Sequence, residues 1–249
     1  MSDKSRAPEL AAWREFCHRI EALGERVLTD EFPNQSEDGP EAIAHLADQV
    51  SCWLGWSIGH LDTTAPFFHR SNDLVTQWGG PNQDNSYHHA RIDPKRRYRV
   101  HGRMNSCEDF ALTLRVGFMH MEDWGTKVAI SGSDRGIGSG DEFEIFFGGD
   151  GSEPDWVQIP KEVTTLSLRE YYIDWQPLEP AVITIECLDE VPPPPRLLSV
   201  QRITATMALI HKYFRTRSFP LRDILIGFDF VAFPSLSTPD DFSSGKMPK

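Results

Sequence analysis

The sequence predicts a mainly β protein: an antiparallel β-sandwich or jelly-roll-like domain with two N-terminal helices and one C-terminal helix. Apolar residues alternate with polar ones from Asn85 to about Cys187, which is the period of a half-buried strand. Turn signals rich in Gly, Pro and Asp separate these segments, and no helical pattern lies between them. Apolar spacings of three and four, typical of helices, occur outside this region.

Three regions follow from these patterns. Residues 1–62 are expected to form a helical pair packed on the sheet, and residues 78–190 the antiparallel sandwich. Residues 191–249 are expected to contain a Pro-rich linker, a helix, a final strand and a loose tail.

Both N-terminal helices are predicted from an unbroken apolar stripe. The first lies in "PELAAWREFCHRIEALGERVL", where Pro8 suits the first helical turn. The second begins near Pro40, and its stripe runs from Ile43 to Ile58. A stripe of this kind needs an apolar partner, so both helices should pack on another surface.

Six segments after residue 97 read as strands: "YRVHGR", "DFALTLRV", "TKVAIS", "DEFEIFF", "TTLSLREYYI" and "AVITIE". The glycines in "GIGSG" are reminiscent of a nucleotide-binding loop, but a strand pattern follows them instead of a helix. We therefore expect a hairpin loop there. After "VPPPPR", a helix is expected from about Leu198 to Phe214, and "ILIGFDFVAF" reads as one last strand.

Composition excludes several classes of function. The formal net charge of -12 repels nucleic-acid backbones, so no nucleic-acid partner is expected. No apolar run approaches the roughly 20 residues that cross a bilayer, and the N-terminus lacks the features of a secretory signal. We expect a cytoplasmic protein without a membrane partner. Its cysteines are isolated and expected to be free thiols: Cys17, Cys52, Cys107 and Cys187.

Alternation assigns side chains to faces. If Ala90 and Ile92 point to the core, the opposite face of that strand carries Tyr87, His89 and Arg91. In the other strands the same reasoning places these polar residues away from the core: Arg97, Arg99, His101, Arg103, Thr113, Arg115, Glu142 and Glu144. If the strands are neighbours, one face collects two histidines and several arginines that could hold a carboxylate, phosphate or phenolate. The alternative is a solvated face that pairs its own Arg and Glu residues.

The histidines allow two kinds of chemistry. His89 or His101 could act as a single acid/base group, because imidazole titrates near neutral pH. The runner-up is a divalent metal held by His89, His101 and Glu144. No fixed-spacing metal motif is present, so a mechanism without a cofactor is our first expectation.

A second concentration of polar and aromatic residues is "SLREYYIDWQPLEPA". Alternation puts Glu170, Tyr172 and Asp174 on one face, where aromatic rings and carboxylates could line a pocket. The alternative is a strand end at which Asp174 caps the turn before Pro177. No GxSxG elbow occurs, so a Ser-His-Asp triad is not predicted.

The segments "GGPNQDNSYHHARIDPKRRYRVHGR", "FEIFFGG" and "WVQIPKEVTTLSLREYYIDWQPLEPAVITIE" carry a family resemblance. Over about residues 78–186 the chain resembles the bacterial proteins grouped as domain of unknown function number 1214. This resemblance implies a mainly β fold with attached helices, and no particular reaction. The positions that match its pattern are Asn82, Asp84, Asn85, Tyr87, Arg91, Tyr172, Asp174 and Trp175. Part of this pattern could be architectural, because Asn and Asp close turns through their own backbone.

Our functional hypothesis is a cofactor-independent enzyme for a small aromatic or hydrophobic polar substrate, of lyase, isomerase or hydrolase type. The cleft would lie between the sandwich and the N-terminal helices. His89 or His101 would act as acid/base with Asp84, Tyr172 or Asp174, and Arg91 or Arg99 would hold an anionic group. The remaining substrate contacts would come from Asn82, Asn85, Tyr87 and Trp175. The alternatives are a non-catalytic module that binds small molecules or carbohydrate, and a homo-oligomer with this face at its interface.

Overall fold

The computed structural model describes residues 7–29, 39–40, 42–44, 46–48, 50–51, 62–70, 82–117, 123–174, 176 and 178–189. The helix predicted from Leu198 to Phe214, the strand "ILIGFDFVAF", the tail and Trp175 lie outside these residues.

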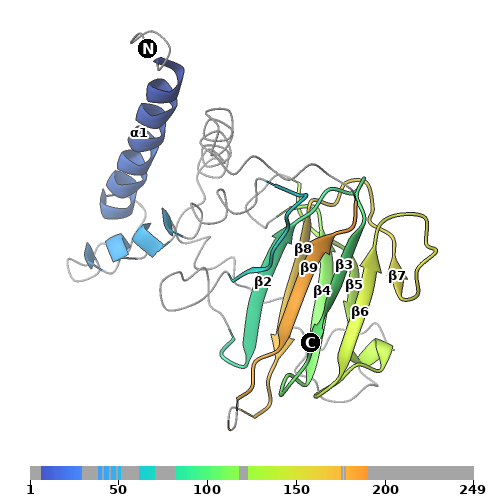
Figure 1. Cartoon of the computed structure of the whole chain (residues 1–249). Coiled ribbons are helices and arrows are strands. Elements are labelled where there is room, and N and C mark those ends of the chain that lie inside the picture. Colours follow the sequence, from blue (N-terminus) through green and yellow to red (C-terminus); the bar gives the residue numbers. More distant parts are fainter. Residues whose placement is uncertain are drawn as a thin grey trace, which may run out of the picture.

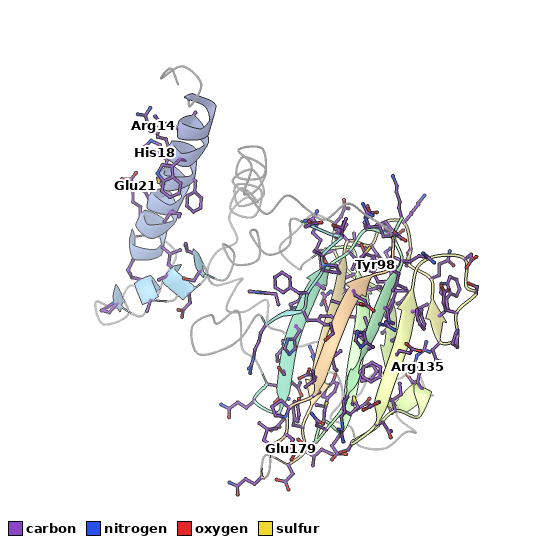
Figure 2. The ribbon with its side chains drawn as sticks, viewed as in Figure 1. Arg14, His18, Glu21, Tyr98, Arg135 and Glu179 are labelled. Carbon is purple, nitrogen blue, oxygen red and sulfur yellow. The ribbon has the colours of Figure 1, made fainter. Side chains whose placement is uncertain are left out.

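The first predicted helix is present as α1 (Ala7–Thr29). Phe16 is buried on it, whereas Trp13 is half exposed, and Arg14, His18 and Glu21 mark its charged side (Figure 2). The described residues between 39 and 51 are helical. They approach α1 at Gly24, where an added Cβ would lie 3.8 Å from the side chain of Leu46. The two helical segments lie together to one side of the sheets (Figure 1). Their packing on a sheet stays a prediction.

Within the described residues, nine strands form two sheets, which confirms a mainly β fold (Figure 1). Sheet A has the order β1 (His69–Arg70), β2 (Asn85–Arg91), β8 (Thr165–Tyr171), β4 (Asp109–Arg115) and β5 (Thr126–Ser131). Sheet B has the order β7 (Trp156–Val157), β6 (Glu142–Phe147), β3 (Tyr98–Arg103) and β9 (Val182–Cys187). Neighbouring strands are antiparallel except β6 and β7. The two-residue strands β1 and β7 were not predicted, since two residues carry no period.

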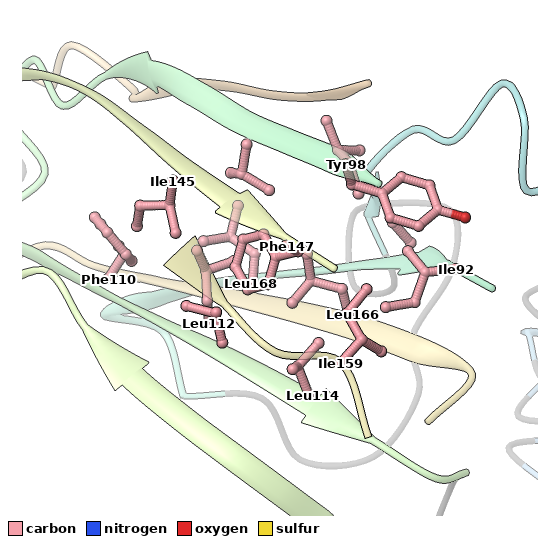
Figure 3. Packing of buried hydrophobic residues seen from close by; sticks show 14 of the residues in the cluster. Ile92, Tyr98, Phe110, Leu112, Leu114, Ile145, Phe147, Ile159, Leu166 and Leu168 are labelled. Atoms are coloured by element: carbon pink, nitrogen blue, oxygen red, sulfur yellow. The ribbon is translucent and has the colours of Figure 1, made fainter. Parts of the chain in front are cut away.

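One hydrophobic core lies between the two sheets (Figure 3). It takes buried side chains from both sheets and from five of the six predicted strands. The sixth, "TKVAIS", packs the partly buried Val128 and Ile130 against it. The predicted inward residues with at most 2% exposure are Ala90, Ile92, Tyr98, Val100, Phe110, Leu112, Leu114, Ile145 and Phe147. Each large apolar side chain buried in this way stabilises the fold by roughly 1.5–3 kcal/mol.

The "GIGSG" segment is not a hairpin loop, which corrects the prediction. It follows the short 3₁₀ helix η2 (Ser133–Arg135) and joins β5 of sheet A to β6 of sheet B. Asp109 anchors η2, because its carboxylate accepts the Ser133 amide at 3.0 Å and the Ser133 hydroxyl at 2.9 Å. Turn residues predict that the chain reverses, but not which sheet the next strand enters.

Tyr98 ties the segment at residues 62–70 to the two sheets. Its buried hydroxyl donates to the Thr63 carbonyl at 3.0 Å and accepts the Asp93 amide at 2.9 Å. Desolvation raises the pKa of Tyr98 to about 12. Tyr98 and Glu179 lie at opposite ends of the sheets (Figure 2). Through Thr63, Tyr98 helps to hold β1 and its His69 beside β2.

Within the described residues, no helix combines the length and the apolar character needed to cross a membrane.

Candidate functional site

The outer face of sheet A, the side away from the core, gathers positive charge. Strand register places its side chains in rows: Tyr87 beside Arg169 and Ala111, His89 beside Ser167 and Thr113, and Arg91 beside Thr165 and Arg115. Alternation along β2, β8 and β4 puts all nine on one face, because the residues between them enter the core. We call these nine residues the basic face.

His89 occupies the middle row of the basic face. Its ring is 7% exposed, and its Nδ1 lies 2.7 Å from the hydroxyl oxygen of Ser167, which is also buried. This contact fixes the orientation of the imidazole and pairs it with an alcohol. β2 pairs with β8 along one edge and with β1 along the other, and His69 of β1 is the register partner of His89 there. Sequence reasoning missed Ser167, because no residue pattern shows that the strand at 165–171 pairs with the strand at 85–91.

The arginines of the basic face differ in their surroundings. Arg169 lies with its guanidinium carbon 4.8 Å from the centroid of the Tyr87 ring and hydrogen-bonds Tyr171. The Nε of Arg115 is buried and makes no hydrogen bond. Desolvation lowers the pKa of Arg115, and the positive charge of Arg169 lowers it further. Among the residues that the structure describes, Arg115 forms no ion pair with a carboxylate.

The loop before β2 supports Tyr87. Asn82 accepts the Asp84 amide on its side-chain oxygen at 2.9 Å, which closes a turn. The Tyr87 hydroxyl accepts the Asn82 amide at 3.1 Å and the Asn85 side-chain amide at 3.3 Å. Asn82 and Asn85 therefore position the aromatic ring on which Arg169 rests. This geometry favours the architectural interpretation of "NQDN".

Asp84 is not brought next to His89. It precedes β2, and five residues of extended strand correspond to about 17 Å. Its backbone carbonyl accepts the Tyr172 amide at 3.0 Å. The predicted pairing of Asp84 with His89 is corrected for this reason.

Tyr172 lies on the opposite side of sheet A from His89, within the core cluster. Its hydroxyl donates to Glu170 Oε2 at 2.9 Å and accepts the Ala181 amide at 3.0 Å. Burial raises the pKa of Tyr172. Tyr172 and His89 cannot act on one substrate atom, which corrects that predicted pairing.

His88 lies near the same carboxylate, and we call His88, Glu170 and Tyr172 the inner cluster. Its Nε2 lies 2.8 Å from the Ser86 hydroxyl oxygen and 3.7 Å from Glu170 Oε2. Glu170 is 5% exposed. Its carboxylate therefore finds its polar partners, Tyr172 and His88, inside the fold. One histidine nitrogen faces both the serine and the carboxylate, so the arrangement differs from a serine triad, which uses both ring nitrogens.

Asp174 follows the strand end. Its carboxylate accepts the Gln176 amide at 2.9 Å, which is the turn-capping alternative. It is exposed and lies three residues beyond the end of β8. Trp175 lies outside the described residues.

The outer face of sheet B carries Arg99 and His101. Arg99 donates to Glu186 Oε1 from Nε at 2.5 Å, and its Nη1 lies 3.4 Å from Glu144. His101 Nε2 lies 3.9 Å from the same Glu186 oxygen. An open hollow of about 570 Å³ covers this area, lined by Arg99, His101, Gly102, Arg103, Glu142, Phe143, Glu144, Val182 and Thr184. Arg99 is already paired with two carboxylates, as expected of a solvated face.

His89 and His101 do not share a face, which corrects a central expectation. The strands β2 and β3 follow each other in the chain, but β2 belongs to sheet A and β3 to sheet B. Their outer faces point away from the common core in opposite directions. The runner-up metal site of His89, His101 and Glu144 is therefore not assembled, although His101 and Glu144 are register partners. In the described part of the chain, no group of three or more His, Cys, Asp or Glu side chains could hold a metal ion.

Comparison with known proteins shows the fold and leaves the chemistry open. No family model matches the chain, so the resemblance to domain of unknown function number 1214 stays a prediction. No curated protein sequence matches it either. A protein of Vibrio parahaemolyticus aligns over 76% of this chain and 45% of that chain at 10% identity and a TM-score of 0.33, too low to support an argument. The crystal structure of an uncharacterized protein from Burkholderia cenocepacia has a TM-score of 0.73 at 19% identity, over 85% of this chain and 59% of that one. This chain therefore has the fold of that Burkholderia protein and spans 59% of its length.

Proposed function

We propose that the chain is an enzyme that binds a small polar molecule on the basic face of sheet A and uses His89 as its acid/base group. The reaction would be of lyase, isomerase or hydrolase type and would need no cofactor. The observation that carries the proposal is the 2.7 Å contact between His89 Nδ1 and the Ser167 hydroxyl in the middle of this face. Imidazole is the side chain best suited to exchange protons near neutral pH.

The surroundings of His89 support this assignment over His101. His89 is almost fully buried, and interactions in a desolvated site are stronger than in water. His101 is 38% exposed, in an open hollow whose nearest cation already has carboxylate partners. Tyr87 and Tyr171 add aromatic surface beside Arg169, which suits a substrate with an aromatic or other apolar part.

The proposal includes the finer description of the fold. We propose that the two sheets form a jelly-roll-like sandwich, supported by the core that they share. The family resemblance, with its helices attached to a β domain, belongs to the same proposal.

The test is turnover and thermal unfolding of three variants, after a thermal-shift screen of aromatic acids, phenols, esters and sugars for a ligand. His89→Gln should abolish turnover and leave the melting temperature nearly unchanged. Ser167→Ala should reduce kcat by tenfold or more, since positioned acid/base groups contribute about 10²–10⁴-fold. His101→Gln, on the other sheet, is the matched control and should retain activity.

Two results would refute the proposed role of His89. Unfolding of His89→Gln together with full activity of Ser167→Ala would make His89 structural. Loss of activity in His101→Gln alone would move the chemistry to sheet B. Tight binding without turnover of any bound ligand would instead identify the non-catalytic binding module.

A further inference from the structure

The basic face has arginine side chains in its two outer rows, and His89 with two small hydroxyl side chains in the row between them. Arg169 stands in one outer row and Arg115 in the other, while Ser167 and Thr113 occupy the middle row. Along β8, the two outer rows are four residues apart, which corresponds to about 13 Å. The two hydroxyl groups of the middle row, those of Ser167 and Thr113, lie between the rows that hold the arginines.

Electrostatics shows what kind of molecule this arrangement suits. Arg115 and Arg169 are like charges that repel each other, and burial deprives the Nε of Arg115 of water. Bringing two guanidinium groups together costs free energy, which an anion between them offsets. The hydroxyl groups of Ser167 and Thr113 can donate to the same anion.

Arg169 is also held in place in advance. The ring of Tyr87 lies under its guanidinium group, and Tyr171 accepts a hydrogen bond from it. Tyr87 in turn is fixed by Asn82 and Asn85. A cation fixed before binding loses little side-chain entropy on contact with a ligand.

We propose that Arg115, Arg169, Ser167 and Thr113 form an oxyanion cradle that binds a carboxylate or phosphate group of the substrate. This inference rests on the proposed function for the reaction at His89, but the binding itself does not depend on turnover. The substrate class is a small molecule with an oxyanion group next to the part on which His89 acts.

Calorimetric titration of the full chain tests the cradle with benzoate, phenyl phosphate, inorganic phosphate and neutral benzamide at constant ionic strength. At least one anion should bind, and benzamide should bind at least tenfold more weakly. Comparison of benzoate with phenyl phosphate distinguishes a planar from a tetrahedral oxyanion. Arg115→Gln and Arg169→Gln should each weaken anion binding by about tenfold or more, because hydrogen bonds to charged groups are the strong ones.

Arg103→Gln is the matched control, since it removes the same charge from an exposed position on sheet B. It should bind the anion as the unchanged protein does. Should Arg115→Gln fail to fold, Arg115→Lys replaces it: it keeps the charge but loses the planar fork, and should also weaken binding.

Three results would overturn the cradle: no binding of any of the anions, equal affinity for benzamide, or equal weakening in Arg103→Gln. His89→Gln separates this inference from the proposed function, since it should stop turnover and change anion affinity by less than about threefold. Anion binding without turnover would support the cradle and refute the proposed enzymatic function. Turnover of a neutral substrate by His89 without anion binding would support the enzymatic function and refute the cradle.

Discussion

Two adjacent histidines on β2 lie in different environments. His88 turns inward, where its Nε2 faces Ser86 and the buried Glu170, and His89 turns outward to Ser167. One position along a strand reverses the direction of a side chain, so neighbours in sequence serve opposite faces of the sheet. His88 accompanies a buried carboxylate, and His89 belongs to the basic face.

Tyr172 should contribute to stability more than a tyrosine on the outer face. Tyr172→Phe removes the group that serves both the Glu170 carboxylate and the Ala181 amide. Leaving buried polar groups unsatisfied costs about 1–3 kcal/mol each, and urea denaturation measures the loss. The control is Tyr87→Phe, whose amide partners can turn to water and whose cost should stay below about 1 kcal/mol. Equal losses would contradict the importance of the inner cluster.

Alkaline pH should destabilise the protein through Cys107 and Tyr98. Burial raises the pKa of Cys107 from 9.0 to about 12, and that of Tyr98 from 10.0 to about 12. Each pKa is higher in the folded protein, so the stabilisation is complete below the ordinary value and is lost as the pH rises toward 12. The loss is at most about 1.4 kcal/mol for each pH unit and each group. Urea denaturation from pH 8 to 11 should show this fall, and Cys107→Ala should show a shallower one. An identical dependence of the free energy of unfolding on pH in the two proteins would show that Cys107 does not contribute to this loss.

At the scale of elements, β3 and β9 approach each other too closely for a side chain at Gly102. A Cβ there would lie 2.1 Å from the Val182 carbonyl oxygen and 2.8 Å from the Ile183 Cα, both backbone atoms of β9. A flexible side chain could move aside, but a paired strand cannot do so without losing its register.

Gly102→Ala should therefore destabilise the fold by roughly 1–3 kcal/mol or more, as overpacking does. The matched control is Gly138→Ala, where the nearest atom to an added Cβ is the Glu108 carbonyl oxygen at 3.9 Å. Thermal unfolding of both variants measures the difference. If Gly102→Ala melts at the temperature of Gly138→Ala, β9 does not approach β3 as described.

The turn before β2 should influence ligand binding through Tyr87 alone. Tyr87→Leu removes the ring beneath Arg169, and a cation–π contact of about 0.5–1 kcal/mol corresponds to a roughly two- to fivefold loss of anion affinity. Tyr87→Phe keeps the ring and should bind within about twofold of the unchanged protein. Calorimetry with whichever anion binds the full chain decides this. An equal loss in both variants would show that the hydroxyl, and not the ring, matters.

At the scale of the whole molecule, the alternation of apolar and polar residues predicts which face of a sheet each side chain lies on. It does not predict which strands are neighbours. The inward residues of β3, β4 and β6 could be predicted, because large apolar residues recur two positions apart in these strands. The assignment of β2 and β3 to different sheets could not, since it depends on long-range pairing that no local pattern encodes. Alternation alone therefore groups His101 with His89 and does not identify Ser167 as the partner of His89. The histidine at position 89 and the arginine at 91 were found on the predicted side of their strand.

Charge distribution follows the same division between the two sheets. The chain carries a net charge of -12, yet the basic face of sheet A combines Arg91, Arg115 and Arg169. On sheet B, the described residues pair Arg99 with Glu144 and Glu186. The outer face of sheet A thus groups arginines together, whereas that of sheet B places Arg99 beside carboxylates.

The most direct test of the oxyanion cradle is to titrate the full chain with an anion that binds it and to follow the arginine Nε–Hε groups by NMR. Resonances are assigned from Arg115→Gln, Arg169→Gln, Arg99→Gln and Arg103→Gln. The signals of Arg115 and Arg169 should move with the anion, while those of Arg99 and Arg103 should stay in place. Movement of Arg99 and Arg103 with no change at Arg115 and Arg169 would place the site on sheet B and contradict the cradle.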